Sequence, residues 1–326
     1  MSLPEIAVLS YHGWEIDPAR LADDVRGLRS RGWADLSLQD LKTALARNSG
    51  SSRRHFHVTI DDGAQGDRDC VATLRGVSCP VTLFLPLEAM SADAQAIHRD
   101  LASCPDVALE DHSLRHNRAF HYRHVIGFHC EEGPLLTSPE RLGLRTGDPV
   151  CTYGSELARR RFTPDLSAGE VCRVAARSLA ERPGGAAWTE ALTARLLESR
   201  LGYRRLGRLC VAGSYESQQA FSYRLSAYLA EGRDLVARFT GRPPIAFAHP
   251  WWEHSRVADA CLRELGYALT FSGRGMCRRR TAFQIPRLLV SNDTPRPIDP
   301  HVLAGNGSGS AVATWVRDVG RRAVFA

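Results

Sequence analysis

The sequence predicts an α/β fold built around a parallel sheet or barrel, and two observations predict it. Strand-like apolar runs alternate with amphipathic helical segments along most of the chain, which is the pattern of consecutive βα units. In addition, aspartates and histidines, which are common metal ligands, stand immediately after several of those strand-like runs. Because loops at the carboxyl ends of parallel strands carry the chemistry in such folds, we expect these residues to meet at one end of the sheet.

The alternation begins at the amino-terminal end. Leu21, Val25 and Leu28 recur at helical spacing, so residues 18–31 are expected to form an amphipathic helix. Further helices are predicted at 38–47 and 67–76. The strands predicted in this part of the chain are 6–10, 56–60, 81–85 and 107–109.

The same alternation returns towards the other end of the sequence. A long helix is predicted at 217–239 and a shorter one at 255–265. Strands are predicted at 245–248, 267–271 and 285–290. The Gly- and Ser-rich run 305–310 is expected to be a flexible segment before a carboxyl-terminal helix through Val312, Trp315 and Val316.

Between these two regions lies additional chain. One helix and one strand could connect His116 to Pro250 in roughly 30 residues, yet the sequence between them is several times longer. Residues 121–214 are therefore interpreted as an insertion, with turn signals and helical patterns at 168–181 and 187–199. We expect a single catalytic domain over 1–326, with 121–214 packed near the active site and not folding as a separate domain.

The composition restricts the class of protein. At 326 residues the chain could form one large domain or two, and 44% apolar residues suffice for a sizeable core. No apolar run of 18 residues occurs, which excludes a transmembrane helix. The first residues lack the pattern of a signal peptide, so a cytoplasmic location is expected. Nine dispersed cysteines without a C-x-x-C pair agree with that location and predict mainly buried thiols.

The charge is moderately basic, with a formal net charge of +6, and Lys42 is the only lysine. Arginine clusters at 159–161 and 278–280 could meet phosphate or nucleic acid, or could simply be solvated. No basic stripe interleaved with aromatic residues accompanies them, so no nucleic-acid partner is expected. No oligomeric state is predicted.

Two adjacent carboxylates end one predicted strand. Asp61 and Asp62 follow the run 55–60 and precede Gly63. Like charges this close raise each other's pKa unless a cation or separate partners compensate. An economical arrangement places one carboxylate on a metal and leaves the other to handle protons. The alternative is that Asp-Gly here is an ordinary turn.

Two histidines follow another predicted strand. His112 and His116, at positions i and i+4, would project from one side of a helical turn and could share an ion. An Asp/His/His set with a position left for water matches a catalytic zinc site. Ser113 stands where the H-E-x-x-H metalloprotease motif has glutamate, so that motif is absent. Two unrelated surface histidines are the alternative, but both halves of the set follow strands and could meet.

Four segments resemble motifs of one known family. Residues 59–63 resemble its T-F-D-D-G block, and 112–116 its H-[ST]-x-x-H block. Residues 247–252 resemble F-[RA]-x-P-[YW]-G in the branch without the arginine, except that Trp252 replaces glycine. The start at 8–12 resembles V-L-x-Y-H. The chain thus resembles the polysaccharide deacetylases of the NodB-homology type, carbohydrate esterase family four, over residues 5–120 and roughly 215–290.

The resemblance implies a deformed (β/α) barrel of that type, with a large insertion between the histidine loop and a late strand. It also implies roles for individual residues. Asp61 would be the general base, while Asp62, His112 and His116 would bind a divalent ion, for which zinc is the expectation. A backbone N–H near Trp251 would help to stabilise the oxyanion. The side chains Trp251, Trp252 and Tyr11 are expected to contact the substrate.

The family's late L-x-x-H block, which supplies the general acid, has no counterpart in this sequence. The acid therefore stays open among His12, His249 and a histidine of the insertion. The insertion histidines in question are His121, His124 and His129.

The expected function is that of a metal-dependent deacetylase. It would hydrolyse the N-acyl amide, with N-acetyl expected, of an amino sugar or a sugar-containing biosynthetic intermediate. A cytoplasmic location favours a small-molecule substrate, and the arginine excess permits an anionic one. The alternatives are a non-sugar amide or formamide hydrolase of the same fold, and a non-catalytic carbohydrate-binding relative.

Overall fold

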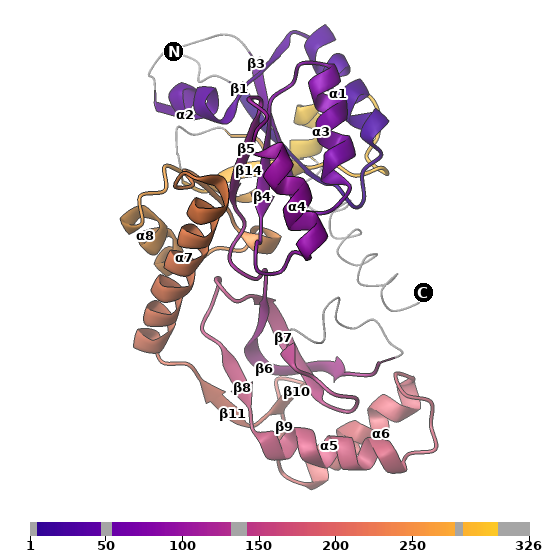
Figure 1. The fold of residues 1–326 in the computed structure, drawn as a ribbon. Coiled ribbons are helices and arrows are strands. Elements are labelled where there is room, and N and C mark those ends of the chain that lie inside the picture. Colours follow the sequence, from indigo (N-terminus) through magenta and orange to yellow (C-terminus); the bar gives the residue numbers. More distant parts are fainter. Residues whose placement is uncertain (1–4, 47–53, 132–141, 278–282, 306–326) are drawn as a thin grey trace. The chain divides into compact units, whose positions relative to one another are not determined.

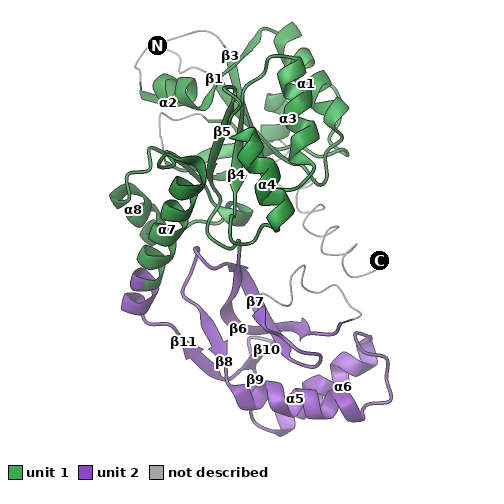
Figure 2. Ribbon diagram, viewed as in Figure 1, with its two compact units in different colours: residues 1–116, 224–308 green, residues 117–223, 309–326 purple. Residues whose placement is uncertain are grey.

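The computed structural model describes residues 5–46, 54–131, 142–277 and 283–305. The chain divides into two compact units (Figure 2). The first unit contains residues 1–116 and 224–308, and the second contains 117–223 and 309–326.

The first unit is built on a closed barrel of seven parallel strands (Figure 1). Around the barrel the strand order is β1-β14-β13-β12-β5-β4-β3, and the pairing of β3 with β1 closes it. The short strand β2 (Trp33–Asp35) pairs only with β3, outside the closed ring. The barrel strands are β1 Glu5–His12, β3 Arg54–Asp61, β4 Val81–Leu85, β5 Val107–Asp111, β12 Ala246–Ala248, β13 Leu269–Arg274 and β14 Ile285–Leu289. The predicted (β/α) barrel is confirmed.

Side chains that alternate along a barrel strand belong to two different apolar clusters. On β1, Leu9 and Tyr11 pack in the cluster that includes side chains of the surrounding helices, whereas Ile6 and Val8 belong to the cluster that includes α2. Successive side chains of a strand point to opposite faces, so Ser10 and His12 lie on the face opposite Leu9 and Tyr11. The helices of this unit are α1 Pro18–Ser30, α2 Leu38–Ala46, α3 Asp67–Gly76, α4 Ala92–Leu101, α8 Arg256–Glu264, α9 Pro300–Gly305 and most of α7 Gln218–Thr240.

Side chains cap several of these helices and fix where they begin. The carboxylate of Asp17 accepts a hydrogen bond from the backbone N–H of Ala19 at the start of α1. Ser91 and Ser255 cap α4 and α8 in the same way. Such caps satisfy backbone N–H groups that have no partner within the helix.

The second unit has its own sheet and its own hydrophobic cluster. An antiparallel sheet has the order β7-β6-β10-β9, and β11 pairs with β8. Trp188 and Leu192 of α6 pack with Phe128 and Cys172 in a buried cluster. The elements are β6 Arg118–Phe128, β7 Pro149–Ser155, β8 Phe162–Pro164, α5 Leu166–Ser178, α6 Ala186–Glu198, β9 Gly202–Arg205, β10 Arg208–Val211 and β11 Gly213–Tyr215.

This second unit contains the stretch interpreted from the sequence as an insertion at 121–214. The expectation that this stretch packs near the active site stays a prediction, as does the single-domain interpretation. The predicted carboxyl-terminal helix through Val312 lies outside the described residues.

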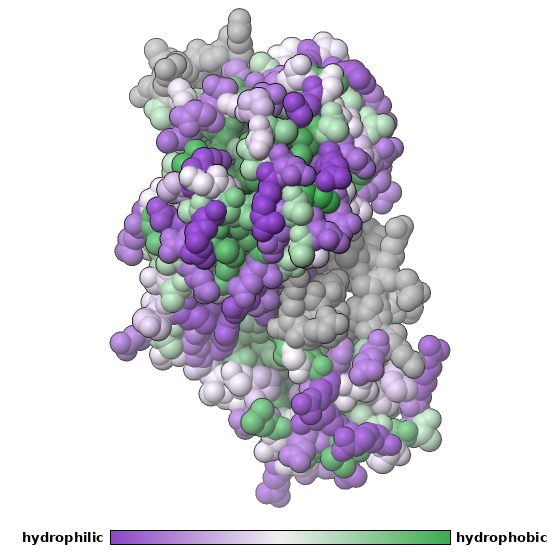
Figure 3. All heavy atoms as spheres, viewed as in Figure 1, coloured by the Kyte–Doolittle hydropathy of each residue, from purple (hydrophilic) through white to green (hydrophobic). Residues whose placement is uncertain are grey.

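Three further properties concern the molecule's surface and thiols. On the face seen in Figure 3, hydrophilic residues predominate and apolar residues lie among them. Among the described helices, none is long and apolar enough to cross a membrane. No disulfide forms within the described part of the chain, and all the cysteines except Cys104 are buried, as predicted.

Candidate metal centre

The paired aspartates lie at the carboxyl end of β3. Asp61 is the last residue of the strand and is 1% exposed. Asp62 has a φ of 77° and Gly63 one of 62°, so the chain turns sharply there. A Cβ at Gly63 would come within 2.6 Å of the sulfur of Met90, so the turn requires glycine. The segment is therefore a turn that places the two carboxylates in different backbone positions, Asp61 at the end of the strand and Asp62 within the turn.

One oxygen of Asp62 faces both predicted histidine ligands. Its Oδ1 lies 3.5 Å from Nε2 of His112 and 3.4 Å from Nε2 of His116. These ligand atoms all lie within 4.8 Å of one another. Oδ1 is buried and accepts no hydrogen bond of ordinary length from the described residues.

These distances fit a metal ion. Zinc ligands at 2.0–2.2 Å in tetrahedral geometry lie about 3.4 Å from one another, which is close to both separations found here. They are also longer than good N–H···O hydrogen bonds. The three predicted ligands therefore converge as a metal site requires, with a buried oxygen that lacks another partner.

A loop, not a helical turn, brings the two histidines together, so the sequence prediction of a helix at this point is wrong. Ser113 and His116 have positive φ values of 70° and 52°. The backbone N–H of His116 donates to Oγ of Ser113 at 3.1 Å, which fixes the bend. The ring centroids of His112 and His116 consequently lie 4.8 Å apart.

The ring of His112 is oriented by the next strand of the barrel. Its Nδ1 lies 2.8 Å from the carbonyl oxygen of Ala248, at the end of β12. With the proton on Nδ1 donated to that carbonyl, Nε2 carries the lone pair that faces Asp62 and can bind a metal. The side chain is 2% exposed, so little solvent competes for either nitrogen.

Asp61 has partners of its own, different from those of Asp62. Nη1 of Arg287 donates to its Oδ1 at 2.7 Å, and Oγ of Ser10 donates to Oδ2 at 3.4 Å. Burial raises the pKa of Asp61, but the charges of Arg287 and His112 outweigh burial and leave this pKa below its usual value. Asp61 is therefore ionised at neutral pH.

Arg287 is a residue of the site that no sequence motif indicated. It lies on β14, is fully buried, and its guanidinium carbon lies 5.7 Å from the ring centroid of Phe84. An arginine within the otherwise apolar run 285–290 was the available signal, because a buried charge requires a partner.

The pKa values of the proposed ligands Asp62 and His112 are shifted in opposite directions. Burial raises the pKa of Asp62, but the imidazoles of His112, His116 and His12 outweigh it and hold that pKa far below its usual range. Burial lowers the pKa of His112, but Asp61 and Asp62 outweigh it, so the pKa of His112 is raised. The site thus concentrates negative charge where a cation would be bound.

His12 and Trp14 approach the second oxygen of Asp62. Nε2 of His12 lies 3.8 Å from Oδ2, and the indole Nε1 of Trp14 donates to the same oxygen at 3.2 Å. The His12 side chain is 17% exposed. Trp14 was not identified from the sequence, because nothing in the sequence near it indicated a contact with a residue 48 positions away.

His249 has different surroundings. Its side chain is fully buried, and its Nε2 lies 3.3 Å from Oδ1 of Asp259. The other oxygen of Asp259 lies 3.3 Å from Nδ1 of His254. Burial is the main cause that lowers the pKa of His249. Of the insertion histidines, His121 and His124 belong to β6 in the second unit, and His129 follows that strand.

The predicted substrate-contacting residues fall into two groups. Trp251 packs on a metal ligand, with its ring centroid 4.1 Å from that of His116, and Trp252 lies 6.0 Å from the guanidinium carbon of Arg287. Both tryptophans have positive φ, 52° and 62°, in a region that favours glycine, which is the residue that Trp252 replaces in the motif. Tyr11 is only 1% exposed and its hydroxyl donates to Asp24, so this side chain belongs to the core and its burial argues against a substrate contact.

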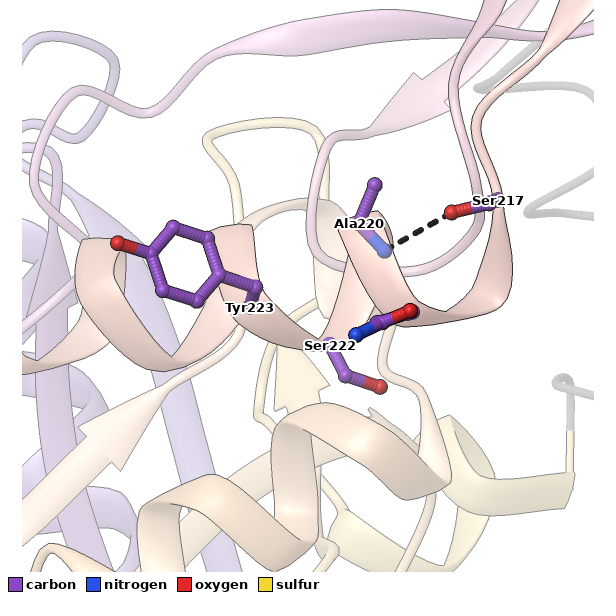
Figure 4. A pocket seen from close by; sticks show the side chains of 5 residues that line it. Ser217, Ala220, Ser222 and Tyr223 are labelled. Atoms are coloured by element: carbon purple, nitrogen blue, oxygen red, sulfur yellow. Dashed lines mark hydrogen bonds between the residues drawn. The ribbon is translucent and has the colours of Figure 1, made fainter.

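A separate surface pocket of about 660 Å³ lies at the start of α7 (Figure 4). It is lined by Ser217, Gln219, Ala220, Ser222 and Tyr223. None of the predicted site residues lines it. The backbone N–H of Ala220 donates to Oγ of Ser217 beside it, as a helix cap.

Comparison with known proteins identifies the fold. No protein-family model matches the sequence, and no curated protein matches it. Among solved structures, a de-N-acetylase from Aggregatibacter actinomycetemcomitans is similar with a TM-score of 0.59 and 12% identity, over 93% of this chain and 100% of that one. The deacetylase domain of BpsB from Bordetella bronchiseptica is similar with a TM-score of 0.55 and 17% identity, over 88% and 96% of the chains. IcaB from Ammonifex degensii is similar with a TM-score of 0.54 and 15% identity, over 90% and 94%. The fold is that of the polysaccharide deacetylases, as the motifs predict.

Proposed function

We propose that this protein, with the fold of the polysaccharide deacetylases, is a metal-dependent N-deacetylase that acts on the N-acetyl amide of an amino sugar. One observation carries the proposal: two adjacent aspartates have separate partners, Asp62 two converging histidines and Asp61 an arginine. A division of labour between a metal ligand and a proton acceptor requires this separation. The names of the similar structures, which describe deacetylases, support the same reaction class.

Asp62, His112 and His116 would hold the ion, and zinc is the expected one given the distances and the Asp/His/His set. Such an ion lowers the pKa of a bound water towards 7 and polarises the acyl carbonyl.

Asp61 is proposed as the general base. Its Oδ1 is engaged by Arg287, so Oδ2 is the oxygen that would accept the proton of the attacking water. The lowered pKa keeps this carboxylate ionised at neutral pH, as a proton acceptor must be. Arg287 would hold the carboxylate plane in one orientation throughout the reaction.

His12 is proposed as the general acid that protonates the leaving amine. His12 lies beside Asp62, and the His12 side chain is partly accessible to solvent. His249 is fully buried against Asp259, which suits it better to a structural role. A backbone N–H near Trp251 remains the proposed oxyanion donor.

The substrate is proposed to be a small amino sugar or a sugar-containing biosynthetic intermediate. The cytoplasmic location and the anionic character of the substrate stay predictions from the sequence. If 121–214 covers the site, as expected, short N-acetyl sugars will be hydrolysed faster than polymeric chitin.

The direct test combines metal content with activity. Purified protein is stripped with a chelator, reloaded with zinc, and incubated with N-acetylglucosamine, N,N′-diacetylchitobiose and a formamide, and the released amine is measured. We expect one zinc per chain, amine release from the N-acetyl sugars, and loss of both in His116→Ala. Undiminished stoichiometric zinc in His116→Ala would show that the ligand set is wrong, and preferential hydrolysis of the formamide would reject the sugar substrate.

A further inference from the structure

The loop after β1 presents a tryptophan to solvent beside the metal ligands. Trp14 is 63% exposed, an unusual position for the largest aromatic side chain. Its indole N–H nevertheless donates to Oδ2 of Asp62, and its ring lies 5.4 Å from the ring of His12. The apolar faces of the indole therefore remain accessible while its polar edge is engaged in the candidate site.

The loop that carries Trp14 is held from several sides. The N–H groups of Glu15 and Ile16 both donate to the carbonyl of His12 at 3.0 Å, and Ile16 is buried. The side chain of Asn292 bridges the loop, donating to the carbonyl of Glu15 and accepting from the N–H of Asp17. Exposure of Trp14 is thus a property of an anchored loop.

Two glycines allow the loop to lie close to the start of α3. Any side chain at Gly13 would collide with the carboxylate of Asp67, and any side chain at Gly66 would collide with the carbonyl of Gly13. Asp67 is itself buried and paired at 2.9 Å with Nε2 of His98 on α4. These close approaches hold the backbone next to Trp14 against the start of α3, so the position of the loop is set by packing within the protein and not by a ligand.

The hydrogen bond from Trp14 also affects the metal ligand. Oδ2 of Asp62 receives the indole N–H, while Oδ1 faces His112 and His116. The indole therefore favours a carboxylate that binds an ion through Oδ1 alone. Groups that hydrogen-bond to a metal ligand commonly change metal affinity by 10- to 100-fold.

We propose that Trp14 is a specificity-determining residue that recognises the face of a pyranose ring and, through its indole N–H, positions Asp62 for the metal. The proposal rests on the proposed deacetylase function and extends it to the recognition of the sugar. An accessible aromatic face attracts the C–H groups of one side of a pyranose, whereas an amide without a sugar ring offers no such surface. Because the same side chain contacts the metal ligand, a sugar stacked on it would lie next to the ion.

Two substitutions separate the two roles. Trp14→Phe keeps an aromatic face and removes the N–H, whereas Trp14→Ala removes both. The matched control is Tyr223→Ala, which truncates another exposed aromatic side chain, 78% exposed, that belongs to the second unit and is not one of the proposed site residues.

The first measurement is zinc affinity by competition with a chromophoric chelator, which needs no turnover. We expect a dissociation constant about tenfold higher for Trp14→Phe and for Trp14→Ala, and no change for Tyr223→Ala. The second measurement is KM at saturating zinc for N,N′-diacetylchitobiose and for N-acetylethanolamine, an amide without a ring. Trp14→Ala should raise KM for the sugar roughly tenfold and leave KM for the small amide within about twofold, and Trp14→Phe should retain most of the preference.

Zinc bound as tightly by Trp14→Phe as by the wild type would overturn the positioning role. An unchanged KM ratio in a folded Trp14→Ala protein would overturn the recognition of the sugar. Failure of the proposed function itself would look different, because the wild type would then hold no zinc or would release no amine from either substrate.

Discussion

At the scale of single residues, the two neighbouring aspartates show how environment assigns different roles to the same side chain. Asp61 is buried against Arg287, whereas Asp62 points one oxygen at two histidines and the other at Trp14. We predict that Asp61→Asn keeps the metal but slows turnover by roughly 10²–10⁴, the usual contribution of a positioned general base. Metal analysis and kcat measured on the same preparation check this. Loss of the ion from a folded Asp61→Asn protein would make Asp61 a ligand.

Arg287 provides a second prediction. Its Nη1 donates at 2.7 Å to Asp61, which is not one of the proposed metal ligands. Arg287→Gln should therefore lower kcat by about 10- to 100-fold and leave the zinc content unchanged. Arg29→Gln is a matched control, because Arg29 also pairs with a carboxylate at 2.8 Å, that of Asp35 on β2. Both variants should lose stability in urea unfolding, but only Arg287→Gln should lose activity, and an equal loss of kcat in both would contradict the positioning role.

His57 makes stability depend on pH. It is fully buried, and burial lowers its pKa to about 4, against the partly opposing hydrogen bond to the carbonyl of Leu36. The unfolded chain, with a pKa near 6.5, binds a proton more readily, so the stabilisation is complete above about pH 6.5 and is lost as the pH falls towards 4. The full loss is on the order of 3 kcal/mol. Urea unfolding at several pH values should show a flatter dependence for His57→Gln than for the exposed control His301→Gln.

Much of the candidate site could be predicted from local sequence, and the remainder could not. Asp62, His112 and His116 belong to two short motifs, 59–63 and 112–116, whose residue types and spacing indicate a metal site. Arg287 is 226 residues from Asp61, and only closure of the barrel brings them together. Local patterns report which residues share a turn or a strand, so contacts of this range are invisible to them.

At the scale of elements, long amphipathic helices and buried parallel strands were predicted well. The range predicted for α3, 67–76, coincides with the observed Asp67–Gly76, and that for β4, 81–85, coincides with Val81–Leu85. The strands of the second unit were missed. Several of them, such as β9 Gly202–Arg205 and β10 Arg208–Val211, are only four residues long, which is too short to show a clear apolar alternation. Helix α4, Ala92–Leu101, was missed as well, and only three of its residues are buried.

The short helical segment η2, Pro250–Trp252, allows a test of local strain. Trp252 has a φ of 62°, a region in which residues with a Cβ are disfavoured by roughly 1–2 kcal/mol. Trp252→Gly and Trp252→Ala both remove the indole, but only glycine adopts this φ without cost. We predict that the glycine variant is more stable than the alanine variant by about 1 kcal/mol in urea unfolding. Equal stabilities would mean that the segment relaxes to negative φ once the indole is gone.

At the scale of the whole molecule, the two compact units have separate apolar clusters. Trp188, Leu192 and Phe128 form part of a cluster confined to the second unit. We predict that residues 117–223, expressed alone, give dispersed amide NMR signals and a cooperative thermal transition. A collapsed chain without fixed side-chain packing would instead support the sequence interpretation of an insertion that depends on the catalytic domain.

The order of strands around the barrel has a consequence for biosynthesis. Strand β1 is paired with β3 on one side and with β14 on the other, so the ring closes only after β14, the last of its strands in the sequence, has left the ribosome. Asp61, Asp62 and both histidines are translated first. Ala248, which orients His112, follows in β12, and Arg287, which orients Asp61, follows only in β14. Residues 117–223 of the second unit are synthesised before β12 to β14 and can fold earlier, since domains generally fold as units during synthesis. Catalytic competence would therefore be acquired only once β14 has been synthesised, and a polypeptide released before β14 would carry the motifs without the activity.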